Sequence, residues 1–109
     1  MSSRLGDFVV EHQYAVNVND METLLERLSH VRQWLTDLGV ANYELWQDSD
    51  NSGRINEVIA YDSWSHYMRL SQKPLPPKLK EVYDDLSRLI EGGFDKVVTQ
   101  KWEPIPLSN

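Results

Sequence analysis

The spacing of apolar residues switches between a two-residue and a three-to-four-residue period, and the order of these switches restricts the fold most. Residues 8–17 alternate as a strand does, with one face formed by Phe8, Val10, His12, Tyr14 and Val16. In residues 21–38, apolar side chains recur at helical intervals, at Met21, Leu24, Leu28, Val31, Leu35 and Leu38. Asn19 or Asp20 can cap this helix, and Gly39 can end it. The first half of the chain therefore predicts a strand followed by a long helix.

The middle of the chain predicts a hairpin that runs directly into a short helix. Residues 42–48 and 54–61 have the composition of strands, and the DSDNSG stretch between them suits a turn. After Tyr61 the spacing becomes helical, with Asp62 or Ser63 as the capping residue. On this spacing we expect Trp64, Tyr67 and Met68 to share a stripe.

Prolines divide the helical region that follows. In KPLPP, residues 73–77, they remove backbone donors and restrict their neighbours, so we expect a break there. Pro77 suits the first turn of a further helix, which Gly92 and Gly93 would stop. A last strand is predicted within residues 96–104, ended by Pro104.

The order strand, helix, strand, strand, broken helix, strand is typical of a ferredoxin-like α+β fold. This βαββαβ order predicts a four-stranded antiparallel sheet with the helices on one face and the second helix broken between Pro74 and Pro77. With 109 residues, of which 40% are hydrophobic, we expect one globular domain over residues 1–109.

Charge and composition argue against several classes of partner. The net charge of −6 repels phosphate backbones and anionic membranes, so we expect neither nucleic acid nor membrane as a partner. The chain has no cysteine, which excludes disulfides and thiolate metal ligands and fits a reducing compartment. It has neither the features of a signal peptide nor an apolar run of about 18 residues. We therefore expect a cytoplasmic protein.

A ferredoxin-like sheet leaves one face without helices, yet apolar side chains occur on both faces of these strands. The set consists of Val10, Tyr14, Trp46, Ile55, Ile59 and Trp102. A second copy stacked sheet to sheet would cover the bare face, and a symmetric pair is the commonest way for a small chain to do so. We therefore expect a homodimer through the open sheet face.

The element order, the chain length and the strand that ends in EVIAYDSW, residues 57–64, resemble the dimeric α+β barrel superfamily, especially its antibiotic biosynthesis monooxygenase-like group. The resemblance covers roughly residues 8–103. It implies two sheets that form a barrel between subunits, with a pocket between each sheet and its helices. It also implies a cofactor-independent oxygenase that acts on a small aromatic molecule.

The resemblance does not extend to the haem-degrading members of that superfamily. Where those proteins have a tryptophan and, ten residues later, a histidine that ligates iron, this chain has Tyr61 and Ser71. We therefore expect no cofactor. The asparagine that such enzymes use on the first strand corresponds to His12, which is the candidate catalytic residue. The alternative is that His12 is a hydrogen-bonded core or interface histidine.

The aromatic residues form the candidate ligand site. A slot for a flat aromatic ligand could be built from Trp46, Tyr61, Trp64, Tyr67 and Tyr83, together with His66, although such residues also serve as packing. We expect Trp64 and Met68 to pack on the sheet and His66 and Tyr67 to reach the pocket mouth. The alternative to an enzyme is a ligand-binding, regulatory or structural dimer without catalysis.

Two further chemistries receive little support from the sequence. No His, Asp and Glu grouping has the spacing of a metal site such as H-E-x-x-H, so we expect no metal. Glu44 and Glu57 could lie on one face of the hairpin as a carboxylate pair with a raised pKa, but we expect them to be ordinary solvated strand residues.

Overall fold

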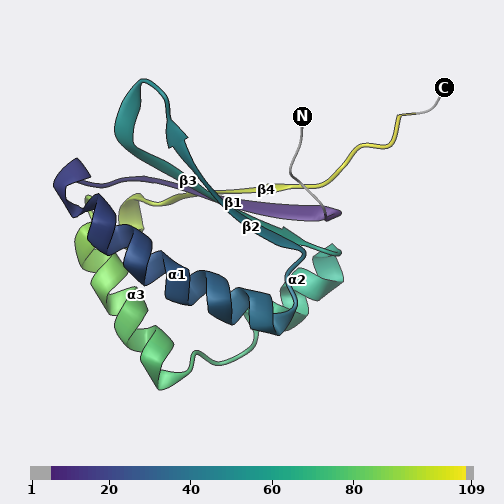
Figure 1. Cartoon of the computed structure of the whole chain (residues 1–109). Coiled ribbons are helices and arrows are strands. Elements are labelled where there is room, and N and C mark those ends of the chain that lie inside the picture. Colours follow the sequence, from purple (N-terminus) through teal and green to yellow (C-terminus); the bar gives the residue numbers. More distant parts are fainter. Residues whose placement is uncertain (1–5, 108–109) are drawn as a thin grey trace.

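A computed structural model describes residues 6–107 and confirms the ferredoxin-like α+β architecture. One antiparallel sheet has the strand order β2-β3-β1-β4, and the helices lie on one of its faces (Figure 1). In chain order the elements are β1 (Phe8–Ala15), the 3₁₀ turn η1 (Val18–Asp20), α1 (Met21–Leu38), β2 (Asn42–Asp48), β3 (Asn51–Tyr61), α2 (Trp64–Ser71), α3 (Pro77–Leu89), the 3₁₀ turn η2 (Phe94–Lys96) and β4 (Val98–Trp102).

The alternation along β1 and β3 divides the sheet into a helix-covered face and an open face. Phe8, Val10 and Tyr14 join the main core on the helix side, together with Ile55 and Ile59 of β3. The residues between them point the other way, where Val9, Val58 and Ala60 form a small second cluster. Of the six apolar residues that suggested an uncovered face, four therefore pack under the helices.

Trp46 and Trp102 are the two members of that set on the open face. Trp46 alternates with Tyr43 and Leu45, which pack on the helix side, and Trp102 pairs with Val9 across β1 and β4. Both indoles are about half exposed.

Helix α1 forms where the periodicity predicts it. Leu24, Leu28, Val31 and Leu35 are buried against the sheet. At its end, Gly39 has φ 97°, and its N–H donates to the carbonyl oxygens of Leu35 and Thr36. The start differs from the expectation, because Asp20 occupies the capping position without a side-chain hydrogen bond, while Asn17 caps the preceding turn η1.

The hairpin is tighter than the DSDNSG composition suggests. β3 begins at Asn51, which pairs with Asp48, and the Asp48 side chain accepts a hydrogen bond from the Asp50 N–H. Gly53 therefore lies inside the strand. A Cβ atom there would approach the carbonyl oxygen of Val16 to 2.7 Å, so the close backbone contact between the hairpin and the end of β1 requires glycine.

Helix α2 exposes a different face from the one expected. Ser63 caps it by accepting from the His66 N–H, and the buried residues are His66 and Leu70, whereas Trp64 is 55% exposed. The expected packing of Trp64 on the sheet is wrong, because the His66 ring turns inward and its Nδ1 accepts from the Asp62 N–H at 3.2 Å. That bond satisfies a backbone donor before the helix start and fixes which side of α2 faces the sheet.

The second helical region is broken as predicted. Residues 72–76 separate α2 from α3, and α3 begins at Pro77 and ends before Gly92 and Gly93, both at positive φ. The last strand is shorter than residues 96–104, because residues 94–96 form turn η2. Within residues 6–107, no helix has the length and apolar character that a membrane span requires.

Candidate functional site

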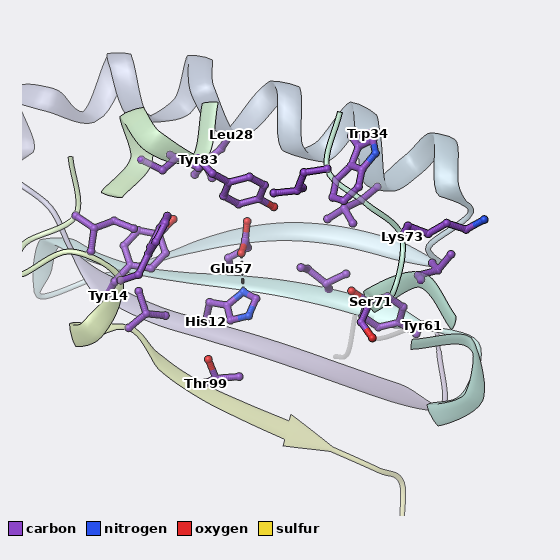
Figure 2. A pocket seen from close by; sticks show the side chains of 18 residues that line it. His12, Tyr14, Leu28, Trp34, Glu57, Tyr61, Ser71, Lys73, Tyr83 and Thr99 are labelled. Atoms are coloured by element: carbon purple, nitrogen blue, oxygen red, sulfur yellow. Dashed lines mark hydrogen bonds and ion pairs between the residues drawn. The ribbon is translucent and has the colours of Figure 1, made fainter. Parts of the chain in front are cut away.

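A cavity of about 580 Å³ lies between the helix-covered face of the sheet and the three helices. This volume is in the range of small-molecule sites. In Figure 2, Tyr14 lies at one end of the cavity, Tyr61, Ser71 and Lys73 at the other, and His12 with Glu57 between them. The lining residues are His12, Tyr14, Leu28, Trp34, Leu35, Glu57, Ile59, Tyr61, Leu70, Ser71, Lys73, Leu75, Tyr83, Leu86, Ile90, Phe94, Val97 and Thr99.

The polar centre of the cavity is a hydrogen-bonded chain of His12, Glu57 and Tyr43. His12 Nδ1 lies 2.7 Å from Glu57 Oε1, and the Tyr43 hydroxyl donates to Glu57 Oε2. The Glu57 side chain is only 10% exposed, while that of His12 is 31% exposed. Glu57 thus holds one imidazole nitrogen in the wall and leaves Nε2 of the neutral ring as its basic atom.

Strand register places these groups together. His12 of β1 is paired with Glu57 of β3 on one side and with Thr99 of β4 on the other. Directly opposed residues of antiparallel strands have side chains on the same face. The three side chains therefore form a row across the floor of the cavity, fixed by backbone pairing and not by a loop.

Burial keeps the phenols of this site protonated. It is the main cause that raises the pKa of Tyr14, Tyr43 and Tyr83, and the negative charge of Glu57 is the next. Burial also raises the pKa of Tyr61, followed by the effects of Tyr67 and Glu57. These hydroxyls are therefore hydrogen-bond donors throughout the neutral range.

The structure places some of the predicted site residues together and separates others. His12 and Tyr61 both line the cavity. Trp46 is outside it, because it lies on the open face, where its Nε1 donates to Glu44. The buried His66 and the half-buried Tyr67 do not line the cavity. Both rings pack edge-on against Tyr61, which does line it. Their expected place at the pocket mouth is therefore wrong.

Trp64 is likewise outside the cavity, on the exposed side of α2. The mouth residues from this region are instead Ser71, Lys73 and Leu75, which belong to the end of α2 and the segment before α3. Tyr61 and Ser71 stand where the haem-degrading members of the superfamily have a tryptophan and an iron-ligating histidine. Both line the cavity.

Sequence reasoning missed Glu57 as a site residue. It is buried, and it lies on the opposite face from Glu44, so the two do not form a carboxylate pair. The signal was present in the alternation of Ile55, Glu57, Ile59 and Tyr61, which puts a carboxylate on an otherwise apolar face. Trp34 was missed as a lining residue because it lies at the edge of a helix stripe, whereas Tyr83, one of the aromatic residues expected at the site, does line the cavity.

Among residues 6–107, no group of three or more His, Cys, Asp or Glu side chains is arranged to hold a metal ion. The polar groups that line the cavity are the imidazole of His12, the carboxylate of Glu57, the ammonium group of Lys73, the hydroxyls of Ser71 and Thr99, and several phenols.

The fold and the cavity define a class: a small α+β protein with the fold of antibiotic biosynthesis monooxygenase-like proteins, as the sequence resemblance predicted. Neither a family model nor a curated protein matches the sequence itself.

Three similar solved structures belong to this class. A candidate antibiotic biosynthesis monooxygenase from Deinococcus radiodurans has a TM-score of 0.69 at 16% identity, with 94% of this chain and 96% of that chain covered. A second such candidate, from Nitrosomonas europaea, has a TM-score of 0.70 at 10% identity, with 91% and 99% covered. A mutant of SnoaB, a cofactor-independent oxygenase from Streptomyces nogalater, has a TM-score of 0.69 at 12% identity, with 94% and 97% covered. At these identities the likeness shows the fold.

Proposed function

We propose that this protein is a small cofactor-independent oxygenase that binds a flat phenolic molecule in the cavity and uses His12 as a general base. The observation that carries the proposal is the His12–Glu57 pair in the floor of a largely apolar cavity. The fold shared with a cofactor-independent oxygenase is consistent with it.

The pair suits proton abstraction for an electrostatic reason. A neutral imidazole that takes a proton from a phenol becomes a cation between two anions, the phenolate and Glu57. Glu57 stabilises that cation and keeps Nε2 directed at the substrate, which is the role of a carboxylate behind a catalytic histidine. The Tyr43 hydroxyl holds the other oxygen of Glu57 in place.

The proposed reaction needs dioxygen and no other co-reactant. His12 removes the phenolic proton, and the electron-rich ring carbon opposite the oxygen forms a bond with O₂. The resulting hydroperoxide loses water, so that the phenol becomes a quinone. One oxygen atom of O₂ enters the product and the other leaves as water, which balances the reaction for 1-naphthol going to 1,4-naphthoquinone.

Oxygen uptake with 1-naphthol in air, compared between wild type and variants, tests the proposal. We expect His12→Ala to lower the enzyme-dependent rate by about 10² to 10⁴, the usual contribution of a general base. His30→Ala is the matched control, because His30 pairs with Glu26 on the surface of α1, outside the cavity. An unchanged rate in His12→Ala would refute the assignment of His12 as the base.

The alternative is a binding protein without catalysis, and one observation favours it. The lining is mostly aromatic and aliphatic, with Lys73 at the far end (Figure 2) as the other basic side chain besides His12, so the cavity could hold a flat ligand without reacting with it. Tight binding of 1-naphthol without oxygen uptake or quinone formation would support this alternative against the enzyme.

We also propose that a second copy of the chain covers the open sheet face. Trp46, Val98 and Trp102 are each about half exposed on that face, around the buried Val9, Val58 and Ala60 cluster. The side-chain oxygen of Asn56, which is buried there, has no hydrogen-bond partner among residues 6–107. Native mass spectrometry of the purified protein distinguishes a dimer from a monomer, and a monomer at micromolar concentration would contradict this part of the proposal.

A further inference from the structure

One polar group in the cavity is not used by the His12–Glu57 pair. The Tyr14 hydroxyl is buried and has no hydrogen-bond partner, one of two such side-chain atoms found within residues 6–107. Tyr14 is 5% exposed and lines the cavity. Buried hydroxyls are nearly always paired, because an unpaired one forfeits the hydrogen bonds it makes in water. The unpaired hydroxyl of a residue that lines a ligand-sized cavity is therefore a group for which a ligand can supply the missing acceptor.

The position of Tyr14 relative to His12 restricts where that acceptor lies on the ligand. The two residues are separated by one residue on β1 and lie on the same face, so their Cα atoms are roughly 7 Å apart. Both side chains stand roughly perpendicular to the sheet. Two ligand oxygens that meet them are therefore several bonds apart and do not sit on adjacent ring carbons.

We infer that Tyr14 determines specificity by donating a hydrogen bond to a second oxygen of the ligand, across the ring from the oxygen that contacts His12. This inference rests on the proposed function, because there the second oxygen is the one taken from O₂. The ligand class is then a flat ring system with oxygens at opposite positions, as in a quinone or a ring with a hydroxyl opposite an ether.

Two other hydroxyls in or beside the cavity do not meet these conditions together. The Tyr43 hydroxyl is already bonded to Glu57. Thr99 is on β4, whose residues are exposed, so water can satisfy its hydroxyl. Tyr61 lies at the opposite end of the cavity (Figure 2) and is a matched tyrosine for comparison.

A pair of nearly isosteric probes tests the inference without turnover. 4-Methoxy-1-naphthol and 4-ethyl-1-naphthol both present a hydroxyl to His12, but only the methoxy oxygen can accept from Tyr14. Their dissociation constants are measured without oxygen, by quenching of tryptophan fluorescence, because Trp34 lines the cavity. We expect the preference for the methoxy probe over the ethyl probe to fall about tenfold in Tyr14→Phe and to stay within twofold in Tyr61→Phe.

An unchanged preference in Tyr14→Phe would overturn the inference, because the hydroxyl would then contact water or pack without recognising the ligand. Tyr14→Met, which also lacks a donor, serves if the phenylalanine variant does not fold. Binding and turnover separate the two proposals. A Tyr14-dependent preference without His12-dependent oxygen uptake refutes only the oxygenase, whereas oxygen uptake with an unchanged preference refutes only this inference.

Discussion

The two faces of the sheet each bury a glutamate, and they use it differently. Glu57 on the helix-covered face is 7% exposed and borders a cavity with an imidazole and a phenol as partners. Glu11 on the open face is 4% exposed and accepts from Asn56 at 3.3 Å, beside the Val9 and Val58 side chains. Burial of a carboxylate therefore does not identify a reactive site. What distinguishes Glu57 is its place in the wall of a cavity, beside an imidazole that also lines that cavity.

The largest expected effect comes from removing the charge of Glu57, and the same change at Glu11 is its control. Glu57→Gln leaves the imidazolium without its counter-charge, so we expect enzyme-dependent oxygen uptake with 1-naphthol to fall about 100-fold or more. Glu11→Gln, on the opposite face, should change it less than twofold. Similar losses of oxygen uptake in both variants would mean that each glutamate supports the fold and that Glu57 has no separate role in catalysis.

A second prediction concerns the open face as a contact surface. Trp102→Glu places a charge where we propose that a second copy packs, and we expect the dimer dissociation constant to rise at least tenfold. Trp64→Glu is the matched control, because Trp64 is similarly exposed but lies on α2, away from the open face. Sedimentation velocity over a concentration series measures both. An equal rise of the dimer dissociation constant in both variants would mean that the open face is not the dimer contact.

A smaller effect is expected from the phenol behind Glu57. Tyr43→Phe removes one donor from the carboxylate without altering the cavity wall, since Tyr43 is not a lining residue. We expect oxygen uptake to fall about fivefold, in line with the roughly 1 kcal/mol that a typical hydrogen bond contributes. The thermal midpoint should be recorded alongside, so that a global loss of stability is separated from the loss of rate.

The smallest effect, confined to high pH, concerns the tyrosines of the helix-covered side. Burial raises the pKa of Tyr14, Tyr43, Tyr61 and Tyr83 in the folded chain. Unfolding therefore releases protons above about pH 10, and the free energy of unfolding falls as pH rises through that range but is insensitive to these groups below it. Urea unfolding at about pH 8 and about pH 11, followed by tryptophan fluorescence, measures this difference, and phenolate absorbance at the higher pH reports the ionisation itself. Constant stability across that range would contradict it.

The sequence predicts the fold better than the site. Periodicity, Gly39 and Pro77 were sufficient to predict the elements, because each acts through local backbone chemistry. The face of α2 that packs on the sheet was predicted wrongly, since it depends on the inward-facing ring of His66 and its hydrogen bond from the Asp62 N–H. The site depends on cross-strand register between residues 45 positions apart, His12 and Glu57, which apolar spacing does not reveal.

The row of Thr99, His12 and Glu57 has a consequence for how the protein can change over evolution. Its geometry comes from the pairing of three strands, so a one-residue insertion or deletion within β1 would turn His12 and Tyr14 to the open face and bring Glu11 and Gln13 under the helices. Cavity and contact surface would be exchanged in a single step. A length change in this strand would therefore disrupt both faces at once, whereas a substitution at every second position of β1 alters the cavity and leaves the open face unchanged.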